Sequence, residues 1–350
     1  MDIESQTNQI QSLLNAEVQA GIPGVLLHIE SPAQKISWSW AAGLADTQNG
    51  QTLQADQQFR IASVTKTFVA CAILRLWEEG RLKLDDPIPA YISAVHTALL
   101  RQGGYEVERI TIRHVLRHAS GLFDHTNSPN FMAKIMQAPD HAWTRTEQVE
   151  MAATDGKPIG PVGEQFSYSD TGYILLGEIV ENLTGQNLHD SLAGLLDFPG
   201  LGLVNTWIET EKDANSQKRI HQYYEGLDTY DFSPTMDLYG GGGLLSTCRD
   251  LAIFFLALFS HKVFRKAHTL DSMLQPFEYS LKPDKDYRLG IWRIQIEGVE
   301  AFTHTGFWGT QVIYLPELNA SVAANYSQIW PIKGTAPLIQ EVAKLLSKVK

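Results

Sequence analysis

The sequence predicts an α/β protein of the α+β kind, an antiparallel sheet flanked by terminal helices with a mostly helical domain inserted into it. Three observations support this. Strand-like segments lie near both ends of the chain, helical periodicity dominates the middle, and short turns join the last strands. We expect residues 1–60 and 240–350 to form one discontinuous sheet domain and residues 61–239 the insertion, with any active site at their interface.

The first half of the chain begins with one helix and two strands. Helical spacing of apolar residues predicts a helix over residues 4–20, ended by a Gly-Ile-Pro-Gly turn. Strands are expected over 25–30 and 35–41, around a Ser-Pro-Ala-Gln turn. A strongly apolar helix follows over 63–79, and Gly80 ends it as a C-terminal cap.

The second half begins with helices and ends with strands. Thr111 is expected to cap a short helix through His118, and a helix over 171–183 closes at Gly185. The apolar run 251–259 predicts a buried helix. In the last quarter, four strands and a closing helix are expected over 288–297, 300–305, 310–315, 320–326 and 333–348.

The composition is that of a globular protein, because 44% of the 350 residues are hydrophobic and 19% are charged. The 28 basic and 39 acidic residues give a net charge of −11, and no basic run of five or more occurs. Such a surface repels a phosphate backbone, so we expect no nucleic-acid partner. Two cysteines are too few for a disulfide framework.

The sequence predicts neither a membrane span nor a leader. Its longest apolar run has nine residues, whereas a spanning helix needs about 20. The N-terminal residues lack the basic start and the apolar stretch of a secretory signal. As the sequence stands we expect a cytoplasmic protein, or a periplasmic or secreted one if a signal was removed.

A serine and a lysine at the start of the apolar helix are the first candidates for chemistry. Residues three apart share a helix face, so the Lys66 amine can reach the Ser63 hydroxyl. A serine needs a base to take its proton, and burial is expected to lower the pKa of Lys66 toward that role. The alternative is that Ser63 merely caps the helix. The same spacing recurs at Ser347 and Lys350, in a charged tail where we expect coincidence.

The second candidate segment is Tyr168-Ser169-Asp170, just before a predicted helix. A tyrosine hydroxyl shuttles protons when a nearby cation eases its ionisation. Asp170 is expected to bind Lys66 or a substrate amide. The alternative is an ordinary turn with Asp170 near a helix N-terminus.

The third segment is His304-Thr305-Gly306, at the end of a predicted strand. A glycine there lets a substrate lie close to the backbone. The N–H groups of Phe307 and Ser63 would then be placed to bind an oxyanion. The alternative is a strand that ends in a glycine turn, with His304 on the surface.

Together these segments resemble the serine β-lactamase and penicillin-binding superfamily. The chain is most similar to its class C-like branch, which also holds D-Ala-D-Ala carboxypeptidases, D-aminopeptidases and esterases. The stretches FRIASVTKTF, LWEEGRLKLDDPI, ITIRHVLRHASGL, FSYSDTGYILLGEIVENLTG, GGGLLSTCRDLAIF and FTHTGFWG look like family segments in family order. The resemblance implies a β-lactamase/transpeptidase-like fold and a serine hydrolase that works through an acyl-enzyme, without metal or organic cofactor.

The resemblance also implies roles for individual residues. Ser63 would be the acylated nucleophile and Lys66 its partner base. Tyr168 would activate Ser63 or the deacylating water, and which of the two groups is the resting base stays open. His304 would be the first residue of the third motif, and the backbone N–H groups of Ser63 and Phe307 would form the oxyanion hole.

Two positions depart from the usual family pattern. Asp170 stands where asparagine is usual, which disfavours anionic substrates unless Lys66 offsets the charge. His304 stands where many β-lactamases have lysine, which favours the peptidase and esterase side. A carboxypeptidase also needs a cation for the substrate carboxylate, and Arg288, Arg293 and His304 are candidates.

The expected pocket is aromatic, which suits an apolar acyl group in a peptide, amide or ester. We expect Phe307, Trp308 and Trp292 on one wall and Phe123 on the other. The predicted function is that of a D-alanyl-D-alanine carboxypeptidase or β-lactamase, with an esterase as the alternative. The expected partner is a small-molecule or peptide substrate, and the oligomeric state is open. The residues expected to bind substrate are Asp170, Thr305, Gly306, Phe123 and Trp308.

Two other classes of protein, a metal hydrolase and a non-catalytic scaffold, are alternatives to a serine hydrolase. His114 and His118 lie four apart on a predicted helix, with Asp124 and His125 nearby, a spacing able to bind zinc in a metal hydrolase. A non-catalytic scaffold is the third alternative. The run 240–243 lacks the spacing of a dinucleotide loop and is expected to let backbone pass close to the site. No GxSxG elbow occurs.

Overall fold

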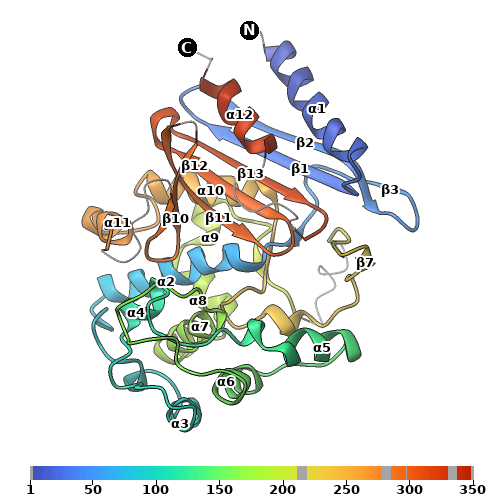
Figure 1. Cartoon of the computed structure of the whole chain (residues 1–350). Coiled ribbons are helices and arrows are strands. Elements are labelled where there is room, and N and C mark those ends of the chain that lie inside the picture. Colours follow the sequence, from blue (N-terminus) through green and yellow to red (C-terminus); the bar gives the residue numbers. More distant parts are fainter. Residues whose placement is uncertain (1–2, 211–218, 278–284, 297, 330–336, 348–350) are drawn as a thin grey trace.

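The computed structural model describes residues 3–210, 219–277, 285–296, 298–329 and 337–347. A large sheet lies between two layers of helices, and the first and last helices lie beside each other on its outer face (Figure 1). Among the described residues, no helix has the length and apolarity needed to cross a membrane.

The main sheet has eight antiparallel strands in the order β3-β2-β1-β13-β12-β11-β10-β9. The two ends of the chain meet at its centre, where Val25 lies opposite Tyr326. The strands are β1 (Gly24–Ser31), β2 (Ile36–Asp46), β3 (Gln51–Thr52), β9 (Lys285–Tyr287), β10 (Trp292–Ile296), β11 (Val299–Gly306), β12 (Thr310–Leu315) and β13 (Ala320–Tyr326).

Alternating side chains of the sheet build two cores, because successive residues of a strand face opposite sides. Val25 and Leu27 pack in the outer core beneath α1 (Ile3–Gln19) and α12 (Pro337–Ser347). Leu26 belongs to the larger inner core, together with most of the helices. The sheet is therefore buried on both faces.

Helix α2 (Thr65–Glu78) forms the centre of the inner core, and nearly all of its residues are buried. Below it in Figure 1 lie α4, α7 and α8, with α3 and α6 further out. The remaining helices are α3 (Ala94–Gln102), α4 (Ile112–Leu116), α5 (Pro129–Gln137), α6 (Arg145–Thr154), α7 (Asp170–Thr184), α8 (Leu188–Leu195), α9 (Phe198–Leu201), α10 (Cys248–Phe259) and α11 (Ala267–Leu274).

Short elements join the helical layer to the sheet. Strand β8 (Leu244–Ser246) pairs with β4 (Phe59–Arg60) on one side and β5 (Trp207–Ile208) on the other. A small hairpin links β6 (Tyr223–Tyr224) to β7 (Leu227–Asp228). Single 3₁₀ turns occur at Ala62–Val64, Ile88–Ala90, His125–Asn127, Pro234–Asp237 and Pro316–Leu318.

The predicted fold class is confirmed: helices combine with one antiparallel sheet fed from both ends of the chain. The predicted helices at the N-terminus, at 63–79 and at 171–183 are present, and Gly185 ends the last of these in the left-handed conformation. Short helices such as α3 and α5 were not predicted. The strand expected over 288–297 is shorter than predicted. Residues 297, 333–336 and 348 of the predicted elements lie outside the described residues. The domain limits at 60 and 240 stay a prediction.

Candidate active site

Ser63 lies on a tight turn directly before α2. Its neighbour Ala62 has a φ of 46°, a left-handed conformation that a non-glycine residue rarely adopts and that is often found at functional sites. Lys66, one turn later, is fully buried, and its Nζ donates a hydrogen bond of 2.8 Å to the Ser63 Oγ. The predicted meeting of this hydroxyl and this amine is present in the structure.

The Lys66 ammonium is held by two further oxygens. It donates to the Gly241 carbonyl at 2.6 Å and forms an ion pair of 2.6 Å with Asp170 Oδ1. Burial acts to lower the pKa of Lys66, but Asp170, Tyr168 and Asp237 together outweigh it, with Asp170 the largest of the three, so the pKa is raised. The expected lowering of the Lys66 pKa is wrong: burial acts in that direction, but the net shift is upward. The expected approach of the glycine-rich backbone to the site is confirmed by the Gly241 carbonyl.

Tyr168 lies beside Ser63 and Lys66, just before the N-cap of α7. Its ring stands 5.1 Å from the Lys66 ammonium and packs on the His118 ring at 4.1 Å. The backbone N–H of Ser169 donates to His118 Nδ1 at 3.1 Å, which fixes that ring behind the tyrosine. Burial raises the pKa of the Tyr168 phenol, and the charge of Lys66 offsets only part of the rise. At neutral pH the phenol therefore keeps its proton.

The end of β11 approaches the nucleophile closely. A Cβ atom on Gly306 would lie 2.1 Å from the Ile61 carbonyl oxygen, so only glycine fits there. This contact brings the chain at Phe307 beside the segment that carries Ser63. The predicted adjacency of the two segments is thus present, while the role of their N–H groups as an oxyanion hole stays a prediction.

His304 lies behind the site and not on the surface, since it is 1% exposed. Its Nδ1 donates to the Thr305 carbonyl at 2.9 Å, and its Nε2 lies 3.3 Å from the Tyr287 hydroxyl. The alternative of a surface histidine is wrong. His304 is not among the residues that line the cavity beside Ser63, and its catalytic role stays a prediction.

A cavity of about 400 Å³ opens beside Ser63. Phe307 and Trp308 line it as predicted, whereas Phe123, Thr305 and Gly306 do not. The Phe123 ring packs where a side chain at 156 would stand. Thr305 is exposed, because alternation along β11 turns it away from the face that carries His304. The other lining residues are Ser63, Asp124, His125, Thr126, Asn127, Phe131, Met132, Ile135, Met136, Gln148, Tyr168, Asp170, Ile174, Tyr224, Phe232, Met236, Asp237, Leu238 and Gly241.

The cavity is acidic. Burial, and then the nearby charge of Asp170, raises the pKa of Asp124 and of Asp237 to about 7 in each case. Burial lowers the pKa of His125 to about 4, so this imidazole is neutral at pH 7. Sequence analysis missed Asp237 and considered Asp124 only as a metal ligand. Neither follows a recognisable motif.

The arginines expected to hold a substrate carboxylate are occupied elsewhere. Arg288 forms an ion pair with Asp286, and Arg293 pairs with Glu300 at 3.0 Å. Neither lines the cavity, and none of the described residues that do is a lysine or an arginine. The structure therefore gives no support to these two candidates as carboxylate ligands.

The histidines proposed as zinc ligands do not form a cluster of ligand atoms among the described residues. His114 Nδ1 accepts the backbone N–H of Thr111 at 3.2 Å, within the cap of α4. In the described part of the chain, the three-residue group with suitable ligand spacing is a different one, Asp46, His221 and Asp228. There too, each ring nitrogen of the histidine already faces one carboxylate, at 3.5 and 2.7 Å.

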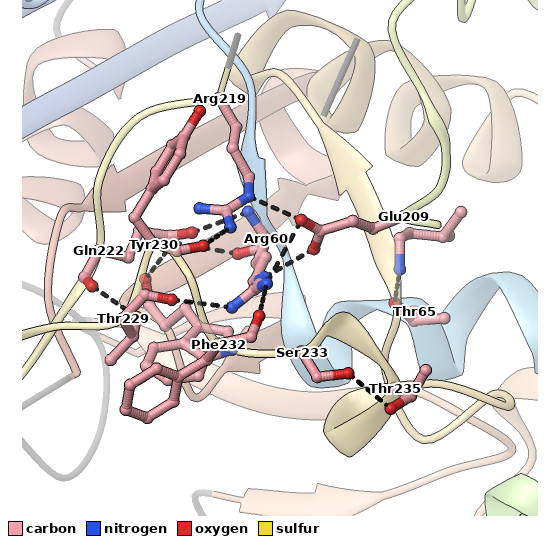
Figure 2. Close-up of polar contacts among 12 residues, drawn as sticks. Arg60, Thr65, Glu209, Arg219, Gln222, Thr229, Tyr230, Phe232, Ser233 and Thr235 are labelled. Carbon is pink, nitrogen blue, oxygen red and sulfur yellow. Dashed lines mark hydrogen bonds and ion pairs between the residues drawn. The ribbon is translucent and has the colours of Figure 1, made fainter. Parts of the chain in front are cut away.

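A buried charge cluster supports the cavity wall (Figure 2). Glu209 lies between Arg60 and Arg219, 2.6 and 2.7 Å from their Nε atoms. Arg60 also donates to the Phe232 carbonyl at 2.7 Å and thereby holds a loop of the wall. Gln222 bonds both the N–H and the carbonyl of Arg60.

The Gln222 amide reaches a second part of the site as well. Its Nε2 donates to the Trp308 carbonyl at 2.9 Å. One side chain therefore joins the strand that leads to Ser63 with the segment after β11. Gln222 is 1% exposed, so these bonds are not replaced by water.

The fold and the residues around Ser63 define a class of protein: a serine on the turn before a buried helix meets a lysine of that helix and a loop tyrosine beside a cavity, next to the end of a sheet strand. Comparison with known families places the chain within that class. The sequence model of the Beta-lactamase family matches residues 7–332, and the chain belongs to this family of hydrolases. The predicted resemblance is confirmed.

Individual relatives are identical to the chain at about a quarter of the aligned positions. Penicillin-binding protein 4* of Bacillus subtilis (strain 168) is 26% identical over 287 residues, 76% of this chain and 59% of that protein. The protein named "Putative D-alanyl-D-alanine carboxypeptidase" of Escherichia coli O157:H7 is 25% identical over 351 residues, 88% of this chain and 79% of that one. The chain thus spans less than two thirds of the first of these relatives.

The fold is also similar to solved structures. The D-stereospecific amidohydrolase from Streptomyces sp. has a TM-score of 0.80 and 26% sequence identity, and the match covers 92% of this chain and 94% of that one.

Proposed function

We propose that this protein cleaves an amide or ester bond through an acyl-enzyme on Ser63. The observation that carries the proposal is the 2.8 Å contact between the Ser63 hydroxyl and the buried Lys66 amine beside a cavity. A hydroxyl held against a group that becomes a base once it has lost a proton, next to room for a substrate, is what nucleophilic catalysis requires. The carboxypeptidase, penicillin-binding protein and amidohydrolase named among the relatives are consistent with this reaction.

In the proposed first step, the Ser63 oxygen attacks the substrate carbonyl and its proton passes to the Lys66–Tyr168 pair. The backbone N–H groups of Ser63 and Phe307 stabilise the oxyanion. The bond to the leaving group then breaks, and the amine or alcohol departs with that proton. In the second step water gives a proton to the same pair and attacks the acyl carbon. The bond from that carbon to the Ser63 oxygen then breaks, the pair returns the proton to that oxygen, and the acid leaves.

Among the substrate classes predicted from the sequence, the cavity favours an amide or ester without a carboxylate beside the scissile bond. D-Ala-D-Ala peptides and penicillins carry such a carboxylate, and no lysine or arginine among the described lining residues would meet it. The apolar wall, with Phe131, Met236 and Trp308, suits an apolar acyl group. An esterase with the same acyl preference is the second candidate.

Covalent labelling tests the proposal. Incubation with p-nitrophenyl esters is expected to place the acyl group on Ser63, located by mass spectrometry of the digested protein, while fluorescent penicillin labels it more slowly. The Ser63→Ala variant is the control and is expected to take up neither label. Turnover that survives in Ser63→Ala, or an adduct at another residue, would contradict the proposal.

The Asp170→Asn variant is expected to move the pH profile of the reaction to lower pH. Asp170 holds the pKa of Lys66 raised, and the reactive form of the Lys66–Tyr168 pair has lost one proton. Removing the carboxylate lowers the Lys66 pKa, so the rising limb of kcat/KM is expected to shift down by about one to three pH units. The pH dependence of ester hydrolysis measures this. Asp271→Asn, exposed on α11, is the matched control, and an unshifted limb in Asp170→Asn would rule out Lys66 as part of the base.

A further inference from the structure

We propose that the cavity beside Ser63 selects substrates whose acyl part carries a protonated amino group, such as amides or esters of amino acids with a free amine. The proposal rests on the proposed function and names its substrate class. It is argued from the carboxylates that line the cavity, from an unpaired acceptor and from the missing cations.

Three carboxylates border the cavity. Asp124, Asp170 and Asp237 all line it, and Lys66, which pairs with Asp170, is the cation closest to them. With pKa values of about 7, Asp124 and Asp237 are largely ionised at pH 7.5, so one ammonium does not neutralise the three carboxylates. The charge of Asp170 helps to raise the pKa of each of the other two, a sign of repulsion that an incoming cation would relieve.

Two of these carboxylates have capacity for a ligand. Asp124 accepts a hydrogen bond of 3.0 Å from the Thr126 N–H through Oδ1 and a second from the Thr126 side chain, and its two oxygens have further lone pairs for a ligand. For Asp237 no hydrogen bond to any described residue is recorded, although it is half-buried and lines the cavity. An ammonium group would supply this carboxylate with donors and an opposite charge.

Gln148 is an independent indication of a donor-rich ligand. Its side chain lines the cavity, is 1% exposed, and its Nε2 donates to the carbonyls of Thr235 and Met236 at 3.3 and 3.2 Å. These two bonds fix the orientation of the amide, and its Oε1 is buried without a hydrogen-bond partner. A buried, unpaired acceptor at the edge of a cavity favours a ligand that donates hydrogen bonds.

Nothing among the described lining residues offsets this acidity. His125 is neutral at pH 7, and its Nδ1 shares a hydrogen bond of 3.0 Å with Thr171. Arg60 is committed to Glu209 and to the carbonyls of Thr229 and Phe232, and its charge offsets only part of the rise in the Asp237 pKa. The cavity therefore attracts a cation and repels an anion, while its apolar wall accepts the rest of the acyl group.

Three matched substrates test the proposal. Phenylalanine p-nitroanilide with a free amine, its N-acetyl form and its N-succinyl form share one acyl skeleton and one leaving group, and carry charges of +1 when the amine is protonated, 0 and −1. In both enantiomeric series kcat/KM is measured at pH 7.5. In at least one series, the free amine is expected to exceed the N-acetyl form by about tenfold or more, as for a hydrogen-bonded charge, and the N-succinyl form to be the slowest.

Single substitutions test which carboxylate is responsible for the preference for a free amine. Asp237→Asn is expected to reduce the ratio of kcat/KM between the free-amine and N-acetyl substrates by about tenfold. Asp231→Asn, an exposed carboxylate six residues earlier in the same loop, is expected to leave this ratio within about twofold of wild type.

The outcomes separate the two proposals. If the N-acetyl or N-succinyl substrate is the fastest in both series and acylates Ser63, the amine preference is overturned while the proposed function stands. An unchanged ratio in Asp237→Asn also overturns it. If neither these substrates nor the esters acylate Ser63, the proposed function fails.

Discussion

Replacing Lys66 by methionine is expected to slow acylation of Ser63 by about 10²- to 10⁴-fold, the range that a positioned general base contributes. Lys66 supplies the amine in hydrogen-bond contact with the Ser63 hydroxyl, and the nearby phenol of Tyr168 has a raised pKa. Methionine fills most of the same buried volume without a charge. The burst of p-nitrophenol during the first turnover measures the acylation rate.

Two controls make this experiment interpretable. Lys66→Met leaves Asp170 without its ion-pair partner, so the double variant Lys66→Met/Asp170→Asn tests whether a stranded carboxylate causes the loss. Lys134→Met removes an exposed lysine paired with Glu147 and is expected to keep the wild-type rate. If Lys66→Met kept more than a tenth of the wild-type burst rate, Lys66 would not be the base.

The core of the site could be predicted from the sequence because it depends on local rules. A spacing of three on a helix is enough to bring Ser63 and Lys66 together. The requirement for glycine at 306 follows from its place at a strand end, and the structure gives the reason, the nearby Ile61 carbonyl. The sequence also indicated Asp170, the first residue of α7, as a possible partner of Lys66.

The predictions that failed concern contacts between segments that are distant in the sequence. The direction of the Lys66 pKa is set by groups far away in the sequence, chiefly Asp170, 104 positions on, and composition does not give that distance. The acidity of the cavity arises where the loop at Asp124 meets the turn at Asp237. Phe123 was placed in the pocket although its neighbour Asp124 lines it, an error of one residue. A sequence pattern indicates which segment borders a pocket, but it seldom shows which of two adjacent side chains points into that pocket.

Some missed helices did leave a local signal. Thr144 and Glu147 form a reciprocal capping box at the start of α6, a pattern visible in the sequence. Ser93 and Ser128 cap α3 and α5 in the same way, each accepting a backbone N–H. These helices are short and only partly apolar, so periodicity alone did not reveal them. A search for caps before a search for periodicity would have found α6.

Glu209→Gln is expected to cost about 3–5 kcal/mol of unfolding free energy, the loss typical of breaking a buried ion pair. The variant keeps the shape of the side chain but leaves Arg60 and Arg219 buried beside each other without a counter-charge. A urea titration measures the change. Glu108→Gln, which breaks an exposed pair with Arg101, is the matched control and is expected to leave the urea midpoint unchanged.

The pH dependence of the same variant distinguishes lost charge from altered packing. Burial acts to raise the pKa of Glu209, but the two arginines outweigh it and the folded-state pKa is lowered. The carboxylate therefore stabilises the fold fully above its unfolded pKa of about 4.3, and this contribution disappears as the pH falls through the folded value. The gap between wild type and Glu209→Gln is expected to be largest near pH 7 and to shrink in acid. A gap that stayed constant down to the acid unfolding of the wild type would mean that shape, and not charge, is what Glu209 contributes.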